Sequence, residues 1–242
     1  MKRLLLIFAT LAMVACGGRG SRIWENSYIL WYVPARLQIK DHYAINSSGL
    51  PVGAPQYYSV EIWDSGSNKP APSFAKSCSY ESNKSLYKQL GQKHHDNNYK
   101  EERYEYPNTP KPSMYCAVSA DFVDIDITVS PAYDAEHPDG SSLADIIKVT
   151  FTSLKPFIDA GYKYTQDYCN GSMCWTHPNY YYCVKMMNEM TARDMILLGP
   201  TMELEFTTPP TTTGDYTLEL KMTSDEGDVY TAIRRGVKIL SN

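Results

Sequence analysis

Strict alternation of apolar and polar residues is the feature that most constrains how this chain folds. Apolar residues occupy every second position from Val123 to Val129, from Ile147 to Phe151 and from Tyr216 to Met222. Successive side chains of a β-strand point to opposite faces of the sheet, so each of these segments is predicted to be a strand with one buried face. The sequence therefore predicts a mainly β fold.

The alternation is lost between Asp64 and Ser113, where a helix is expected only at 83–92. A loop of this length inside a domain is uncommon and is usually functional or disordered. Residues 64–113 are therefore predicted to be a loop-rich insertion and a candidate binding surface. Further strands are expected at 23–39 with a break at Pro34, and at 57–63, 180–184, 202–206, 229–233 and 237–240, with helical turns at 155–161 and 188–194.

The C-terminal part, roughly the last 40 residues, resembles the closing hairpin of an immunoglobulin-like sandwich. Gly214-Asp215-Tyr216 is similar to the tyrosine corner of that fold, in which the tyrosine hydroxyl bonds back to the preceding loop. The Cys…Trp…Cys pattern of antibody domains is missing from the sequence. The resemblance implies an Ig-like antiparallel β-sandwich, built as a single domain over residues 23–242 with the insertion at 64–113.

The N-terminus carries a pattern typical of bacterial export. Lys2 and Arg3 precede an apolar stretch from Leu4 to Val14, which is shorter than the roughly 20 apolar residues that a membrane-spanning helix needs. The stretch ends in Met13-Val14-Ala15-Cys16, which resembles a lipobox, with Met13 standing where that family usually has Leu. The resemblance implies that residues 1–15 are a signal peptide and that Cys16 is lipidated. An ordinary signal peptide followed by a chance cysteine is the alternative.

Lipid on Cys16 would anchor the chain, because each buried methylene contributes about 0.8 kcal/mol. Residues 16–22 are rich in glycine and are predicted to be a flexible tether. Taken whole, the chain resembles uncharacterised lipoproteins of the Bacteroidetes, which supply no activity to carry over. We expect an exported protein held at the outer membrane, on its periplasmic face or at the cell surface. Some of those lipoproteins have acidic residues after the lipidated cysteine that route them to the surface, whereas this chain has Arg19 and Arg22 there.

Composition argues against nucleic acid as a partner. The 23 basic residues fall to 21 when Lys2 and Arg3 leave with the signal peptide, against 27 acidic residues, so the mature net charge is −6. Neutralisation of phosphates drives nucleic-acid binding, and a weakly acidic domain without basic clusters does not provide it. Tyrosine is unusually common, with 20 residues against 6 phenylalanines, which suits both strands and ligand-contact surfaces.

Five cysteines remain once Cys16 is assigned to lipid. In an oxidising compartment disulfides are the default, and five thiols allow at most two of them. A bridge between Cys78 and Cys116 would staple most of the polar insertion, and the other three cysteines compete for a second bridge. The candidate disulfide cysteines are Cys78, Cys116, Cys169, Cys174 and Cys183.

No catalytic motif is recognisable, and no metal site with standard spacing. A zinc site is the alternative to disulfides near residue 170, but the ligand spacing is unusual there, so we expect no metal and no cofactor. Clustered carboxylates can bind calcium or act in glycoside hydrolysis, yet the solvent face of a strand and the chemistry of a turn explain both clusters. His137 is interpreted as a solvated loop side chain. The residues weighed are Cys169, Cys174, His177 and Cys183 for zinc, and Asp121, Asp124, Asp126, Asp225, Glu226 and Asp228 as carboxylates.

Aromatic residues gather beside the last cysteines. Three consecutive tyrosines in a strand must put at least one on each face, so some of these rings can stack on sugars, although packing in the core is the alternative. We expect a non-enzymatic envelope or cell-surface lipoprotein that binds a glycan or a partner protein. The alternative is a structural or assembly lipoprotein that docks through an apolar edge strand. The candidate binding surface is Trp175, His177, Tyr180, Tyr181 and Tyr182.

Overall fold

The structure is a computed structural model of the whole chain. It describes residues 27–29, 31–45, 51–63, 78–79, 83–98, 116–162 and 182–241. The strands are β1 (Trp31–Val33), β2 (Ala35–Ile45), β3 (Pro51–Trp63), β4 (Cys78–Ser79), β5 (Cys116–Val118), β6 (Phe122–Ser130), β7 (Ile147–Ser153), β8 (Tyr182–Met186), β9 (Leu198–Phe206), β10 (Gly214–Ser224) and β11 (Val229–Ile239). The helices are α2 (Lys84–Lys93) and α3 (Lys155–Asp159), with single 3-10 turns η3 (Met187–Glu189) and η4 (Ala192–Met195).

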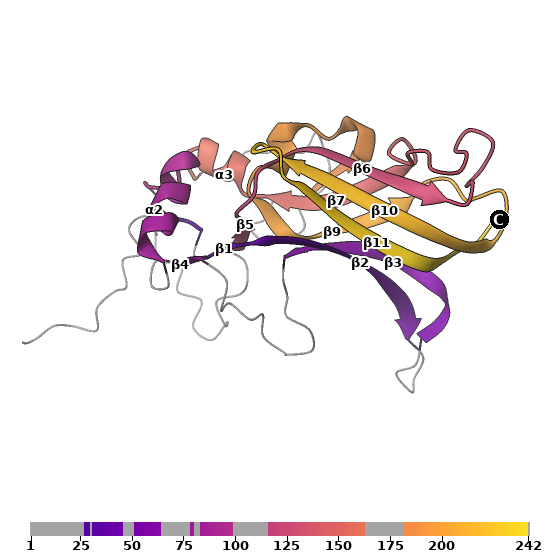
Figure 1. Cartoon of the computed structure of the whole chain (residues 1–242). Coiled ribbons are helices and arrows are strands. Elements are labelled where there is room, and N and C mark those ends of the chain that lie inside the picture. The colour runs from indigo at the N-terminus through magenta and orange to yellow at the C-terminus, as the bar shows by residue number, and fades with distance from the viewer. Residues whose placement is uncertain are drawn as a thin grey trace, which may run out of the picture.

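The prediction of a mainly β fold is confirmed. A five-stranded sheet has the order β2-β3-β9-β7-β8, and a three-stranded sheet has the order β11-β10-β6 (Figure 1). Every pair within these two sheets is antiparallel. A third, smaller sheet has the order β4-β1-β5, in which β1 and β5 run parallel. No helix among the described residues is long and apolar enough to cross a membrane.

The buried faces of the strands follow the alternation in the sequence, except at Val123 of β6, which was expected on the buried face and is 45% exposed. Ile147, Val149 and Phe151 of β7 are at most 1% exposed, while the residues between them are half-buried. In β10 the segment from Leu218 to Met222 alternates in the same way. All of these side chains belong to one continuous hydrophobic core that both larger sheets share. Full burial of such a side chain contributes about 1.5–3 kcal/mol, so the alternation fixes which face of each strand turns inward.

A bulge near the end of β11 precedes the C-terminus. Tyr216 pairs with Val237 but Leu218 pairs with Arg234, so two residues of β11 stand opposite one residue of β10. One of the two is Gly236, whose φ of +68° lies in the left-handed region that favours glycine. Beside the bulge, Arg234 donates to Asp41 of β2 from both Nε, at 3.2 Å, and Nη2, at 2.5 Å. This ion pair ties β11 to the five-stranded sheet.

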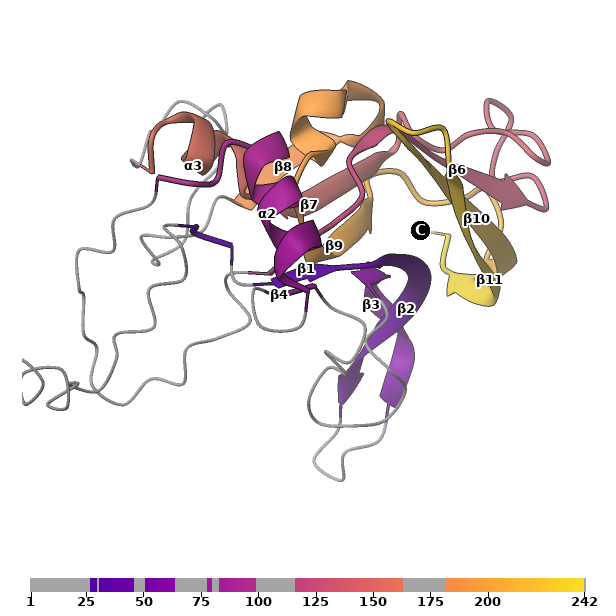
Figure 2. The same cartoon turned by 60° about the vertical axis from the view of Figure 1, so that its left-hand side comes forward.

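The domain has two distinct ends. Both views place α2 and α3 at one end and the loop after β6, with the C-terminus, at the other (Figures 1 and 2). The described chain begins at the α2 end, where the backbone N–H groups of Tyr28 and Ile29 donate to the carboxylate of Asp96 at 2.8 and 2.9 Å. Tyr87 of α2 donates from its hydroxyl to the carbonyl of Ile29 at 2.5 Å. The chain therefore enters the domain beside α2.

The predicted helix at 83–92 is confirmed as α2, and the helical turn at 155–161 as α3. Asn83 accepts a hydrogen bond from the N–H of Leu86, which caps α2. After α3, Gly161 takes a φ of +65°, the conformation in which glycine commonly ends a helix. The turn predicted at 188–194 corresponds to η3 and η4, which are separated by Met190 and Thr191.

The predicted bridge between Cys78 and Cys116 is wrong. Cys78 pairs with Tyr32 on one side of β1, and Cys116 pairs with Trp31 on the other side. Neighbouring strands are about 4.8 Å apart, so the two Cα atoms are separated by roughly 10 Å, whereas a disulfide needs about 4.4–6.8 Å. Cys116 is a buried free thiol, and no disulfide joins two of the residues that the structure describes.

Candidate functional site

Much of the aromatic and cysteine cluster singled out from the sequence lies outside the described part of the chain. Tyr182 opens β8, the edge strand of the five-stranded sheet, and pairs with Thr152 of β7. Cys183 follows it, buried opposite Phe151. Outside the described residues lie Cys16, Cys169, Cys174, Trp175, His177, Tyr180 and Tyr181.

The residues that flank the two candidate binding segments converge at the α2–α3 end. Trp63, which precedes the insertion, pairs with Ala35, the first residue of β2. Ala35 follows β1 closely in the chain, and β1 pairs with β4 and β5 in the small sheet. Tyr162 precedes the aromatic segment, and its hydroxyl accepts a hydrogen bond from the N–H of Asn98 at 3.2 Å. Asn98 and Tyr162, which are more than 60 residues apart in the sequence, therefore lie side by side at this end of the domain.

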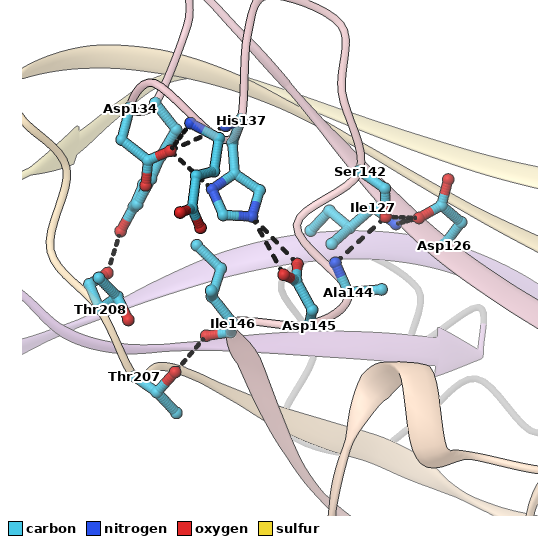
Figure 3. Close-up of polar contacts among 12 residues, drawn as sticks. Asp126, Ile127, Asp134, His137, Ser142, Ala144, Asp145, Ile146, Thr207 and Thr208 are labelled. Carbon is cyan, nitrogen blue, oxygen red and sulfur yellow. Dashed lines mark hydrogen bonds and ion pairs between the residues drawn. The ribbon is translucent and has the colours of Figure 1, made fainter.

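At the opposite end, the loop between β6 and β7 holds a cluster of charged side chains (Figure 3). The ring of His137 lies between two carboxylates, with Nδ1 2.8 Å from Asp134 Oδ1 and Nε2 3.1 Å from Asp145 Oδ1. The histidine is only 5% exposed, whereas the Asp145 side chain is 55% exposed. The interpretation of His137 as a solvated side chain is therefore wrong, because its ring is buried and doubly paired. We call Asp134, His137 and Asp145 the histidine clasp.

Local backbone geometry builds the first half of the clasp. Asp134 Oδ1 accepts hydrogen bonds from the N–H of Glu136 at 2.9 Å and of His137 at 2.8 Å, the arrangement by which an aspartate closes a turn on its own backbone. Tyr133 N–H donates to the His137 carbonyl at 2.8 Å, which closes the turn from the other side. These backbone hydrogen bonds thus hold Asp134 in position independently of its contact with the His137 ring.

The electrostatics favour a protonated imidazole. Burial alone would lower the pKa of His137, but its hydrogen bonds to Asp134 and Asp145 raise that pKa above the ordinary value. Burial likewise acts to raise the pKa of Asp134, but hydrogen bonds from the backbone and ring of His137 lower it. Both ring nitrogens of an imidazolium donate, which matches the two acceptors here. The ring in this arrangement has no free nitrogen with which to activate a nucleophile or ligate a metal.

Tyr133 connects the clasp to the neighbouring loop. Its hydroxyl donates to the carbonyl of Thr208 at 2.6 Å, and its buried ring stacks on Phe206 with centroids 5.8 Å apart. The ring also contacts Tyr216 at 5.7 Å and the His137 ring, edge to face, at 6.3 Å. Burial raises the pKa of the Tyr133 hydroxyl, so it remains a donor at neutral pH. The loop after β6 and the loop after β9 are therefore packed as one unit.

A second charged cluster joins α2 to the sheet framework. Lys93, at the end of α2, donates to Asp121 Oδ2 at 2.8 Å and to Asp225 Oδ2 at 3.0 Å. Asp121 is buried, and its other oxygen lies 3.6 Å from Nε2 of the buried His94, beyond hydrogen-bond distance. Burial lowers the pKa of His94, which favours the neutral ring. A polar hollow of about 130 Å³ beside this cluster is lined by Lys93, Ser119, Ser224, Asp225, Asp228 and Tyr230, among others.

The carboxylate clusters found in the sequence are accounted for by a solvent-facing strand, by local hydrogen bonds and by the ion pairs with Lys93. Asp126 Oδ1 accepts from the Ser142 hydroxyl at 2.5 Å and from the N–H of Ile127 at 2.8 Å (Figure 3). Asp124 is exposed on the same strand, in agreement with the predicted solvent face. Asp225 pairs with Lys93. Within the described residues, no group of three or more His, Cys, Asp or Glu side chains is placed to hold a metal ion.

No family model, curated protein or solved structure matches this chain.

Sequence reasoning missed the clasp because Asp145 reaches His137 only after the loop folds back. The spacing of Asp134 and His137, three residues apart before Pro138-Asp139-Gly140, is a local signal of a closed turn that could have indicated burial. The pairing of Lys93 with Asp121 has no such signal, because it joins the insertion helix to a residue 28 positions later, just before β6.

Proposed function

We propose that this chain is a lipid-anchored protein of the bacterial envelope, of the type found in Bacteroidetes, whose Ig-like β domain binds a glycan or a partner protein without catalysis. The anchor is supported by the charged start, the short apolar stretch and the lipobox-like sequence that ends in Cys16. The described part of the domain begins at Ser27, 11 residues after that cysteine, which is consistent with a short tether.

Strand order supports the Ig-like sandwich. A constant-type Ig domain places strands A, B, E and D in one sheet and strands C, F and G in the other. If β2, β3, β6, β7, β9, β10 and β11 are taken as A to G in chain order, the first sheet runs A-B-E-D and the second runs G-F-C. On this assignment β8 extends the first sheet beyond strand D, and the β4-β1-β5 sheet is an addition to the fold.

The tyrosine corner agrees with the same assignment. In Ig-like domains this tyrosine stands near the start of strand F, and its hydroxyl bonds to the backbone a few residues upstream. Tyr216 lies at the start of β10 and donates to the carbonyl of Thr212 at 2.6 Å. The predicted hydrogen bond to the preceding loop is thus present.

The hydrogen bond between Asn98 and Tyr162 is the observation that carries the binding proposal. It joins a residue of the insertion at 64–113 to Tyr162, which precedes the aromatic residues from Trp175 to Tyr182 in the sequence. Binding surfaces are commonly built from loops held by a rigid scaffold, and here both loops start from one end of a β framework. Aromatic rings from one segment and polar groups from the other suit a sugar or a protein surface.

Mass spectrometry tests the anchor. The chain is expressed in a Gram-negative host, and the mature N-terminal peptide is expected to begin at Cys16 and to carry the mass of its acyl groups. A Cys16→Ser variant is expected to lose that mass and the membrane association. A mature N-terminus elsewhere, or an unmodified Cys16, would show that the lipobox resemblance is misleading.

A thermal-shift screen against host and plant glycans tests the binding. A ligand at a hundredfold over its dissociation constant stabilises the native state by about 2.7 kcal/mol. The shift is expected to disappear in Trp175→Ala and Tyr181→Ala, and to survive in Trp175→Tyr, which keeps an aromatic face. A flat response to every glycan would leave a partner protein as the remaining form of the proposal.

Exposed apolar side chains favour the second candidate, a structural or assembly lipoprotein. Val229 and Ile233 are 62% and 52% exposed on the edge strand β11, and Val123 is 45% exposed on β6. Exposed apolar residues on an edge strand are a template for association with another chain. Cross-linking in intact envelopes distinguishes the candidates, because Val229→Lys with Ile233→Lys is expected to abolish adducts only if this strand docks on another component.

A further inference from the structure

We propose that the histidine clasp is a pH-sensitive fastener of the loop between β6 and β7. Protonated His137 holds Asp134 and Asp145 together, and loss of the proton on Nε2 to solvent releases Asp145 while the contact to Asp134 persists. The inference concerns the fold of the loop and does not depend on whether Cys16 is lipidated.

The geometry decides which proton is lost. Asp134 Oδ1 lies 2.8 Å from Nδ1 and is held in place by the N–H groups of Glu136 and His137. Asp145 approaches Nε2 at the longer distances of 3.1 and 3.3 Å, and its side chain is more than half exposed. The neutral ring therefore keeps its hydrogen on Nδ1. Its Nε2 lone pair then faces a carboxylate, which has no hydrogen to donate at neutral pH.

Release of Asp145 costs little, because its carboxylate is already largely hydrated. The backbone around it stays in place: Asn188 N–H donates to the carbonyl of Ala144 at 3.0 Å, and Thr207 N–H donates to that of Ile146 at 2.9 Å. On the other side, Leu143 N–H donates to the carbonyl of Ile127 at 2.8 Å. The part set free by deprotonation is thus the turn of residues 134–139, which Figure 3 shows facing Asp145 across the His137 ring.

The titratable groups that face His137 come from its own loop. They are the carboxylates of Asp134 and Asp145 and the hydroxyl-bearing ring of Tyr133. Glu136 and Asp139 on the same turn are exposed and add negative charge. Hydrogen bonds to the two carboxylates raise the pKa of His137 despite its burial, so the clasp is closed at acidic pH and opens as the pH rises past that raised value.

Hydrogen exchange and histidine NMR together test the proposal, on the full chain carrying Cys16→Ser to remove the lipid acceptor. The ring resonance of His137, assigned by its loss in His137→Gln, is expected to titrate above its ordinary pKa. Across that titration, the protection factors of amides in residues 134–139 are expected to fall about tenfold, because the proton binds more tightly to His137 in the closed turn than in the open one. Amides of β7 are expected to show no such step.

Two matched variants make the test decisive. Asp145→Asn removes the released carboxylate, so it is expected to lower the pKa of His137 and to abolish the pH step in protection. Asp139→Asn makes the same change of charge at an exposed position in the same turn and is expected to leave the step intact. Constant protection of residues 134–139 across the titration, or a step that survives Asp145→Asn, would overturn the proposal.

Discussion

Tyr216 donates its hydroxyl hydrogen to the carbonyl oxygen of Thr212, four residues earlier, at 2.6 Å. The ring is 3% exposed and packs against Tyr133, so the hydrogen bond fixes how the loop after β9 enters β10. The same Tyr133 bonds to Thr208 in that loop and closes the turn of the histidine clasp. Tyr133 thus sets the geometry of the loops at this end of the domain.

Removal of this hydroxyl is expected to destabilise the domain. Tyr216→Phe keeps the ring and leaves the Thr212 carbonyl without its donor, which costs about 0.5–1.5 kcal/mol. Urea unfolding measures the loss as a lower midpoint with an unchanged slope. The control is Tyr230→Phe, because the Tyr230 hydroxyl makes no hydrogen bond among the described residues; it is expected to change stability little. Equal effects from the two variants would contradict the role given to the Tyr216 hydroxyl.

Local patterns in the sequence were enough to place the main strands. Alternation from Val123 to Val129 and from Tyr216 to Met222 predicted β6 and β10 correctly, because a period of two has only one structural meaning when one face is buried. The hydrogen bond of Tyr216 back to the preceding loop was likewise predictable from three adjacent residues. These features depend on neighbours within a few positions of the chain.

Long-range contacts were beyond the reach of such patterns. Asp96 receives hydrogen bonds from residues 67 and 68 positions earlier, and nothing in its own neighbourhood indicates burial. Cys78 and Cys116 flank a polar stretch, which suggested a staple, but β1 inserts between their strands. The prediction for His137 failed for the same reason, since Asp145 comes close to the ring only when the loop folds back.

Asp96 is a buried carboxylate whose partners are hydrogen-bond donors. It accepts from the N–H groups of Tyr28 and Ile29 and from the hydroxyl of Tyr162, at 2.8 to 3.1 Å, and is 0% exposed. Asp96→Ala leaves the buried N–H groups of Tyr28 and Ile29 without their acceptor and is expected to destabilise the domain by about 2–4 kcal/mol. It should also open residues near 27–29 to limited proteolysis, because these hydrogen bonds hold that segment to the domain.

The same carboxylate gives a pH dependence with a defined sign. Burial raises the pKa of Asp96, and the hydrogen bonds from the Ile29 and Tyr28 N–H groups and the Tyr162 hydroxyl only partly offset it. A folded pKa above the unfolded one means that this group's stabilisation is fully present below the unfolded pKa and is lost as the pH rises through the folded pKa. The unfolding free energy of the wild type relative to Asp96→Asn is therefore expected to grow on acidification. A difference independent of pH would contradict this.

Lys93 is expected to fasten α2 to the sheets. Lys93→Met keeps the length of the side chain but leaves Asp121, whose side chain is 6% exposed, without its cation. We expect a loss of about 1–3 kcal/mol in unfolding free energy and faster hydrogen exchange in α2. Lys148→Met is the control, because it breaks an exposed pair with Glu205 and is expected to cost less than about 1 kcal/mol. A loss of unfolding free energy no larger than that of Lys148→Met would show that Lys93 does not hold α2 to the sheets.

Cys116 is expected to be an inert thiol. Its residue is 2% exposed, and burial raises the pKa of the thiol to about 12. At pH 8 the thiolate fraction is then only about one in ten thousand, and the thiolate is the form that reacts. Iodoacetamide should leave Cys116 unmodified in the native protein and label it rapidly in denaturant. The Cys116→Ala variant identifies the labelled peptide, because that peptide is absent from its map. A non-reduced peptide map should show Cys116 at its thiol mass, and a peptide linking Cys78 to Cys116 would contradict the strand arrangement around β1.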